Sequence, residues 1–230
     1  MKMNTEAIKE RLLFEGADGV YFGYLGPFLS GDIAKLPFSI SILVRLSEYV
    51  ADTLKDGPTK IYFHNYRSIN AMLDRMSLLA QGMIQKQGYR AVAVPASQTD
   101  DSEAIKGFIS HKMAAVHADA GYIGRNALFI SDEFGSAVRL ATVLTDMPVA
   151  EKKIVHRKSE CGSCDLCVRA CPSGAITGAE YEEGAPRESV FLADVCSAYM
   201  KKAYQHIGRG AVCGICIGVC PKRYKGTKEG

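Results

Sequence analysis

The sequence predicts an α+β fold in two parts: a mixed layer of helices and strands over residues 1–150, followed by a cysteine-rich domain over residues 151–230. Three observations support this prediction. Helical and strand-like periodicities alternate along the first part. All eight cysteines lie between residues 161 and 220. A chain of 230 residues with 47% hydrophobic content is long enough for one buried core plus a smaller unit stabilised by a cofactor.

The first three elements are predicted from short-range patterns. Residues 4–14 mix polar and apolar side chains, which favours a short helix over the apolar core of a signal peptide. Gly19–Leu25 is rich in aromatic residues, and Phe38–Val44 alternates between polar and apolar. Both segments are therefore predicted to be strands.

A long helix and a further strand are predicted next. Residues 66–87 place large apolar side chains, several of them methionines, at helical spacing, and Gly88 is expected to end the helix. We interpret the methionines as core filling. Residues 90–94 form a short apolar run that is typical of a strand.

The last elements of the first part are a helix and a hairpin. The helix is predicted over residues 110–120, with Ser110 as its N-cap and Gly121 as its C-terminal cap. Residues 127–144 are predicted to form one β-hairpin that turns at Asp132–Gly135. The segment 147–160 carries a proline and mixed charges, so it is expected to connect the two parts.

Composition excludes several classes of function. The 28 basic and 25 acidic residues are too evenly balanced for a nucleic-acid-binding footprint. No apolar run is long enough for a membrane span, so we expect a cytoplasmic protein without membrane contact. The basic residues Lys222, Arg223, Lys225 and Lys228 are interpreted as a solvated tail.

The cysteine spacing carries the chemistry. Residues 161–172 read C-x2-C-x2-C-x3-C-P, and residues 213–221 repeat C-x2-C-x3-C-P, which suggests an internal pseudo-twofold. Three cysteines at x2 spacing wrap three corners of a 4Fe-4S cubane, while the cysteine before the proline points to the other cluster. Cys196 completes the second set, because Gly210 stands where a regular motif has its cysteine. The predicted ligands are Cys161, Cys164, Cys167 and Cys220 for the first cluster, and Cys171, Cys196, Cys213 and Cys216 for the second.

Zinc and structural disulfides are the alternatives for these cysteines. Zinc favours separate C-x2-C pairs, and disulfides need an oxidising compartment that nothing in the chain indicates. Two 4Fe-4S clusters on a bacterial-type ferredoxin domain therefore predict electron transfer.

The sequence also resembles a known family. The matching segments are GYRA at 88–91, ISHKMAAVHADAGYIGRNALFIS at 109–131 and LTDMP at 144–148, followed by the double cysteine motif, with a looser match at 62–70. They resemble epoxyqueuosine reductase and its relatives, which include the reductive dehalogenases.

The resemblance implies a cobalamin-dependent reductase, with a nitroreductase-related α/β N-terminal domain in front of the ferredoxin domain. Electrons would pass through the two clusters to cobalamin, or to FMN as the alternative. Implied partners are an electron donor such as a ferredoxin or flavodoxin, and a small-molecule or corrinoid substrate. Transfer RNA is not expected, since the chain lacks the helical repeats of many tRNA-acting members. A carrier that reduces a partner's corrinoid or flavin is the alternative function.

Site residues follow from the same resemblance. Its corrinoid pocket includes the AGYIGRNALF segment, where glycines allow close backbone approach and polar side chains donate hydrogen bonds. The family's proposed proton-donating aspartate is replaced here by Pro95-Ala96-Ser97. The binding candidates are Gly121, Tyr122, Gly124, Arg125 and Asn126, and the weak catalytic candidates are Asp100, Asp101, His111, Lys112 and Tyr66. Each also has a plain structural explanation, as a turn, a helix terminus or a core residue.

Overall fold

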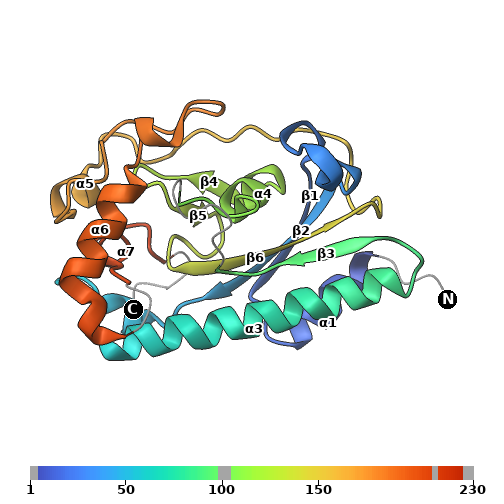
Figure 1. The fold of residues 1–230 in the computed structure, drawn as a ribbon, viewed down its shortest axis with the longest axis horizontal. Coiled ribbons are helices and arrows are strands. Elements are labelled where there is room, and N and C mark those ends of the chain that lie inside the picture. The colour runs from blue at the N-terminus through green and yellow to red at the C-terminus, as the bar shows by residue number, and fades with distance from the viewer. Residues whose placement is uncertain (1–4, 98–104, 209–211, 225–230) are drawn as a thin grey trace.

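A computed structural model describes residues 5–97, 105–208 and 212–224. Its centre is a four-stranded antiparallel sheet in the order β1-β2-β6-β3. The long helix α3 lies along one face, and α4 with the two-stranded sheet β4-β5 lies on the other (Figure 1). The cysteine-rich part stands at one end of this layered body, around α5, α6 and α7. The mixed helix and sheet architecture confirms the predicted fold class at that level.

The described elements follow each other in chain order. The α-helices and strands are α1 (Thr5–Phe14), β1 (Gly19–Tyr24), β2 (Phe38–Arg45), α2 (Glu48–Asp52), α3 (Lys60–Gln85), β3 (Ala91–Val94), α4 (His111–His117), β4 (Gly121–Ile123), β5 (Phe129–Ser131), β6 (Val138–Thr145), α5 (Leu166–Ala170), α6 (Ala193–Tyr204) and α7 (Ile215–Gly218). Short 3-10 helices occur at Gly26–Phe28, Gly31–Lys35, Arg187–Ser189 and Gln205–Ile207.

Strand β2 separates the two layers of the core. It pairs with β1 on one side and β6 on the other, and alternate side chains point to opposite faces. Ile40 and Ile42 belong to the core under α3, while Leu43 packs with Ala115 and Val116 of α4. Both faces of this strand are therefore buried, which explains its almost continuous burial.

Helix α3 begins earlier than the periodicity predicted. Its first residue is Lys60 rather than residue 66, because the Thr59 hydroxyl accepts a hydrogen bond from the Tyr62 amide at 3.2 Å and caps the helix. Met76 is buried against the sheet, which confirms core filling at that position. At 26 residues, α3 is long, but neither it nor any other helix in the described ranges is apolar enough to cross a membrane.

The region after α4 differs from its prediction in two ways. The helix ends at His117, and Asp119 adopts the left-handed conformation (φ 55°), so Gly121 is not its cap. Gly121 instead starts β4, where an added Cβ would overlap the Ile130 carbonyl on the paired strand. The predicted hairpin over 127–144 is also wrong: β5 pairs with β4, whereas β6 joins the main sheet. Local alternation could not distinguish these partners.

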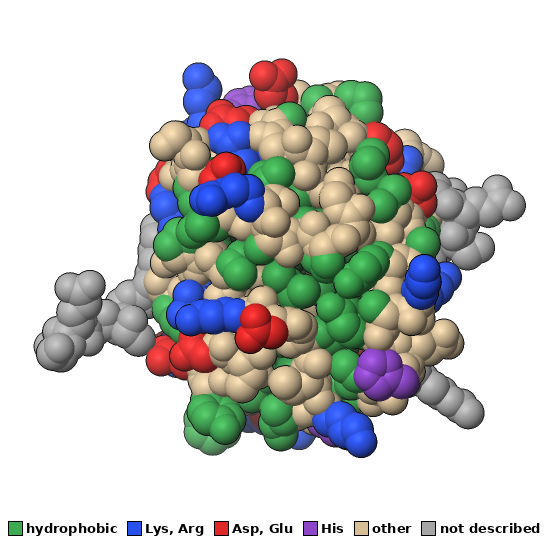
Figure 2. All heavy atoms as spheres, turned by 90° about the vertical axis from the view of Figure 1, so that its left-hand side faces the viewer, with side chains coloured by type: hydrophobic (Ala, Val, Ile, Leu, Met, Phe, Trp, Pro, Cys, Tyr) green, Lys and Arg blue, Asp and Glu red, His purple; other side chains and the backbone are tan. Residues whose placement is uncertain are grey.

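The cysteine-rich part shares contacts with the sheet layer. Helices α5 and α7, one from each cysteine motif, lie against each other, and Ile217 belongs to the same core as Leu54. After α7 the chain returns to the sheet end, where the Ser136 amide bonds to the Lys222 carbonyl at 3.0 Å. Figure 2 shows this end of the molecule, with hydrophobic side chains gathered near the middle of the face and charged ones mostly toward its margins.

Candidate functional site

The first predicted set of cysteines surrounds a single cavity. Cys161 and Cys164 come from the loop before α5, Cys167 from α5 itself, and Cys220 from the segment after α7. All four line one small cavity of ≈ 30 Å³ that is partly open at the surface. Its other lining residues are Asn126, Ile130, Leu166, Pro221 and Lys222. The chain thus brings thiols that are far apart in sequence to one space.

The thiols within this set act on one another. Burial and, to a smaller extent, the neighbouring Cys220, Cys161 and Cys164 thiolates raise the pKa of Cys167 to about 11. All eight cysteines of the chain are free thiols. Within residues 5–97, 105–208 and 212–224, no three His, Cys, Asp or Glu side chains converge to hold a metal ion. Thiols spread around a volume suit a cubane, which needs one thiolate at each of its four irons.

The second predicted set also comes together. Burial and, to a smaller extent, the charges of Cys213 and Cys171 raise the pKa of Cys196 to about 11. The pKa of Cys216 is raised first by burial and then by Cys213 and Cys196, although its side chain keeps some accessible surface. The charge of Cys167, from the first set, also raises the pKa of Cys216. The two sets therefore adjoin.

Hydrogen-bond donors face the sulfurs of the first set. The Arg125 amide donates to Cys161 Sγ at 3.4 Å. Burial raises the pKa of Cys220, whereas the nearby Ser136 hydroxyl opposes that rise. Ser136 Oγ is buried and has no nitrogen or oxygen partner in the described part of the chain, whereas Tyr122 Oη, also buried, lies near the Lys222 ammonium. A donor left without an oxygen partner beside thiolates fits an iron-sulfur cluster, whose sulfurs accept such bonds.

A similar donor serves the second set. Ser173 Oγ lies 3.4 Å from Cys171 Sγ. Burial alone raises the pKa of Cys171, but the Ser173 hydroxyl and surrounding amides outweigh it, so the pKa is lowered. A thiol that is easily deprotonated is ready to ligate iron.

The five predicted corrinoid-binding residues lie in β4 and the turn after it, and the side chains of Arg125 and Asn126 contact the cysteine-rich part. The Arg125 guanidinium donates to the carbonyls of Gly162 and Gly178 and pairs with Glu180 at 3.1 Å. Asn126 donates to the Cys216 carbonyl at 3.2 Å. Gly124 packs so closely against Ile130 that a Cβ would come within 2.6 Å of its side chain. The hairpin thus holds both cysteine sets in place.

Of the catalytic candidates, Asp100 and Asp101 lie outside the described residues. His111, the first residue of α4, bonds through Nε2 to the Pro95 carbonyl at 2.9 Å, so Nε2 carries the proton and Nδ1 accepts from the Thr142 hydroxyl at 2.8 Å. Burial lowers the pKa of His111 and keeps the ring neutral. Its two nitrogens are therefore occupied by structural bonds.

Lys112 has a perturbed environment. Its Nζ donates to the Ala127 carbonyl at 2.6 Å. Burial and, to a smaller extent, Arg187 lower the pKa of Lys112 to about 8, against the opposing effect of the Cys216 thiolate. The Lys112 ammonium, near a cysteine of the second set, is thus still mostly protonated near physiological pH but releases its proton more easily than an ordinary lysine.

Tyr66 lies in a polar network that sequence reasoning missed. Arg139 of β6 donates to the Tyr66 hydroxyl at 3.1 Å, lies over its ring at 4.2 Å from the centroid, and donates to Asn70 at 3.0 Å. Burial raises the pKa of Tyr66, but Arg139 and hydrogen bonds from Ser97 and Asn70 outweigh it, so the pKa is lowered. In the sequence, only the i, i+4 spacing of Tyr66 and Asn70 indicates that these two side chains share a helix face; nothing local predicts that Arg139 joins them.

Tyr62 connects this network to the second cysteine set. Its ring lies 6.2 Å from that of Tyr66 in an edge-on arrangement. Burial raises the pKa of Tyr62, Arg139 opposes the rise, and the Cys216 and Cys213 thiolates add to it. The phenol, the guanidinium and the second set are thus neighbours.

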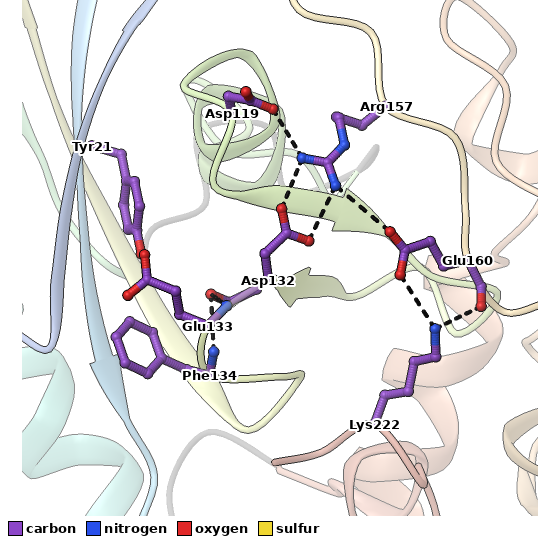
Figure 3. Close-up of polar contacts among 9 residues, drawn as sticks. Tyr21, Asp119, Asp132, Glu133, Phe134, Arg157, Glu160 and Lys222 are labelled. Atoms are coloured by element: carbon purple, nitrogen blue, oxygen red, sulfur yellow. Dashed lines mark hydrogen bonds and ion pairs between the residues drawn. The ribbon is translucent and has the colours of Figure 1, made fainter. Parts of the chain in front are cut away.

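The described end of the supposed basic tail is not solvated as predicted. Lys222 Nζ donates to the Glu160 carbonyl at 2.7 Å, and Arg223 pairs with Asp52 at 2.9 Å. In Figure 3, Glu160 lies between Lys222 and Arg157. The tail prediction failed for these two residues because the partners are more than 60 residues away in sequence.

Comparison with known proteins places these features in context. A family model described as a 4Fe-4S double cluster binding domain matches residues 160–223. The epoxyqueuosine reductase of Bacillus subtilis (strain 168) is 31% identical over 236 residues, which cover 94% of this chain and 56% of that protein. The tetrachloroethene reductive dehalogenase of Sulfurospirillum multivorans is 38% identical over 117 residues, covering 46% and 22%.

A solved reductive dehalogenase, whose title describes B12-dependent dehalogenation, superposes with a TM-score of 0.70 at 18% identity, over 94% of this chain and 31% of that one. This likeness shows a shared fold. The chain spans about half the length of the Bacillus subtilis relative. Domain match, sequence relatives and fold agree: this chain carries a 4Fe-4S double cluster binding domain and is related to the epoxyqueuosine reductases and reductive dehalogenases.

Proposed function

We propose that this chain is an iron-sulfur reductase in which two 4Fe-4S clusters relay single electrons to a cobalamin bound beside the N-terminal part, for reduction of a small-molecule substrate. The observation that carries the proposal is the position of the second cysteine set, next to Tyr62 and Lys112. Redox ligands and proton-bearing side chains meet there, which a reductase requires because electrons and protons are delivered together.

The proposed ligands are the eight cysteines in the predicted sets. Cys161, Cys164, Cys167 and Cys220 hold the first cluster, and Cys171, Cys196, Cys213 and Cys216 hold the second. When bound, the clusters supply one-electron transfer. The chain supplies donors to their sulfurs, from the Arg125 amide and the hydroxyls of Ser136 and Ser173.

Electrons are proposed to enter at the first cluster and leave at the second. The cavity of the first set is lined by Leu166, a residue that is 41% exposed, so an electron donor can approach it. The second set adjoins the residues that handle protons. The proposed donor is a ferredoxin or a flavodoxin, each of which carries single electrons.

Tyr66 is the proposed proton donor. Arg139 lowers the pKa of its phenol and, at 3.1 Å, stabilises the phenolate that forms when the proton leaves. Lys112 is the second candidate, because an ammonium with a pKa of about 8 can release its proton near neutral pH. His111 orients the start of α4 through its two hydrogen bonds. A role for Asp100 or Asp101 stays a prediction.

The cobalamin assignment rests on the relatives and on the hairpin between the cysteine sets. When bound, a corrinoid supplies a reducing metal centre. Gly121, Tyr122, Gly124, Arg125 and Asn126 are proposed to support it mainly by fixing the hairpin, since the Asn126 amide and the terminal nitrogens of Arg125 already bond to the cysteine loops. FMN is the alternative cofactor. The nitroreductase relationship and the division at residue 150 remain proposals.

An electron carrier without a substrate of its own is the second candidate function. It is favoured by the hydrogen bonds of Arg125 and Asn126: these side chains, expected to bind the corrinoid, already bond within the protein. Such a carrier would reduce a partner's corrinoid or flavin. Transfer RNA is not proposed as a substrate in either case.

Anaerobic purification followed by cofactor loading tests these functions. About eight iron and eight sulfide atoms per chain are expected, from two cubanes. The protein is then incubated with hydroxocobalamin or FMN and passed through a gel-filtration column. Retained corrinoid absorption supports the reductase, retained flavin absorption replaces cobalamin by FMN, and retention of neither supports the carrier. About four irons per chain, or zinc in their place, would contradict both functions.

A further inference from the structure

Lys222 stands at the wall of the first cysteine cavity. It lines this cavity together with Cys161, Cys164, Cys167 and Cys220. Its Nζ donates to the Glu160 carbonyl, lies 3.5 Å from the Glu160 carboxylate, and lies 5.5 Å from the centroid of the Tyr122 ring. The ammonium is therefore tied to the residue that directly precedes the first cysteine.

An ion-pair network fixes this arrangement from the other side (Figure 3). Arg157 pairs with Asp132 at 2.8 Å and with Asp119 at 2.9 Å, and its guanidinium lies 3.7 Å from the Glu160 carboxylate. Glu160 is thus held between two cations. The β4-β5 hairpin, the connector that carries Arg157 and Glu160, and the segment that carries Lys222 therefore meet beside the cavity.

The backbone of Lys222 is anchored as well. Its carbonyl accepts the Ser136 amide at 3.0 Å, and the next carbonyl, of Arg223, accepts the Ala137 amide at 3.1 Å. Gly135 (φ 75°) lies so close that an added Cβ would overlap these carbonyls. The ammonium therefore has a defined place next to the cavity, unlike a cation on a free tail.

A fixed cation next to a cluster affects how readily the cluster accepts an electron. A cubane with four thiolates is anionic, and reduction adds one more negative charge. A positive charge in the wall of the cluster's cavity stabilises the reduced form more than the oxidised form. The carboxylate of Glu160 offsets part of this effect, but it is shared with Arg157 and about half exposed.

We propose that Lys222 is a positioning and charge-supplying residue that raises the reduction potential of the cluster held by Cys161, Cys164, Cys167 and Cys220, while leaving the other cluster's potential unchanged. This inference rests on the proposed function, since it requires both clusters. It assigns a role to a residue outside the cysteine motifs. A higher potential at this cluster favours acceptance of electrons from the donor.

Potentiometric titration followed by electron paramagnetic resonance tests the inference on the anaerobically purified holoprotein. In K222M, the ratio of reduced to oxidised first cluster at a given potential should fall on the order of tenfold, which corresponds to about 59 mV for one electron. The charge-retaining K222R should stay near the wild-type potential. The matched control is K86M, which removes an exposed lysine at the end of α3, distant from the cysteines, and should change neither cluster.

A Cys196→Ser background, which lacks a ligand of the second cluster, identifies the cluster that shifts. The inference is overturned if K222M leaves the first cluster's potential unmoved, if both clusters shift equally, or if K222R shifts as far as K222M, which would indicate a purely structural role. Iron content separates the two levels of failure. About eight irons with an unmoved potential overturns this inference alone, whereas about four irons in the wild type overturns it together with the two-cluster proposal.

Discussion

The two cysteine sets have similar sequence motifs but different surroundings. The first lines a small cavity and faces Lys222, Tyr122 and the chain end. The second adjoins Tyr62 on α3 and Lys112 on α4. The motif predicts the ligands, whereas the neighbouring elements give each cysteine set its own surroundings. The first set lines a cavity that is partly open at the surface, and the second adjoins side chains that carry protons.

The largest expected effect separates the two sets directly. Cys216→Ser should leave about four irons and abolish electron delivery beside Tyr62, so reduction of a bound cofactor by dithionite should fall at least ~100-fold. Cys161→Ser should also leave about four irons. Because dithionite is small enough to reach the second cluster without the first, the rate should fall less than ~10-fold. Equal losses in the two variants, measured by stopped-flow absorption, would contradict the proposed direction of electron flow.

The next effect concerns the wall of the first cavity. Gly135→Ala should destabilise the protein by roughly 2 kcal/mol more than Gly184→Ala. Both positions have positive φ, so both variants bear a similar backbone cost, but only at Gly135 does the added Cβ meet the backbone of Lys222 and Arg223. Anaerobic urea unfolding measures the difference. Equal destabilisation would mean that Lys222 and Arg223 do not dock against Gly135 in solution.

A third prediction concerns the proton-bearing side of the second set. Arg139→Gln should raise the pKa of Tyr66, because the cation that favours the phenolate is lost, and should cost about 1–3 kcal/mol through unpaired polar groups. In the wild type, folded Tyr66 loses its proton at lower pH than the unfolded chain, so it adds stability as pH rises toward 10.0. The variant should lose this contribution.

Tyrosinate absorption during a pH titration measures this shift. Tyr66→Phe should remove the tyrosine that titrates below the usual range. Arg67→Gln is the matched control, because Arg67 lies on the same helix over the ring of Phe63, which has no proton to titrate. An unchanged low-pH tyrosine signal in Arg139→Gln would show that another group perturbs Tyr66.

The smallest effect is expected at His111, at the start of α4. Burial lowers the pKa of this imidazole, so the folded protein keeps it neutral while the unfolded chain takes up a proton below about pH 6.5. The unfolded state then binds more protons, so stability falls as pH decreases through that value. His111→Gln should flatten this part of the stability curve by at most about 1 kcal/mol. An identical slope in wild type and variant, measured by thermal unfolding between pH 5 and 7, would assign the effect elsewhere.

Much of the fold could be predicted from local patterns. Periodicity located α1, β1, β2 and β3 to within a residue or so, and Ser110 was identified as the N-cap of α4, where its hydroxyl accepts from the Met113 amide at 3.3 Å. The start of α3 was missed, although Thr59 carried the signal. The pairing of β5 was missed because alternation marks a strand but does not name its partner.

The sequence by itself determined the kind of chemistry expected of this protein, through eight cysteines at cubane spacing, and a short-range order of helices and strands. These features depend on residues that are close in the sequence, so they can be predicted from local patterns. Only the tertiary structure decided the surroundings of each set. Arg139 reaches Tyr66 across 73 residues, and Lys222 reaches Glu160 across 62. Charge and hydrogen bonding act through space, and folding alone brings these side chains within reach of one another.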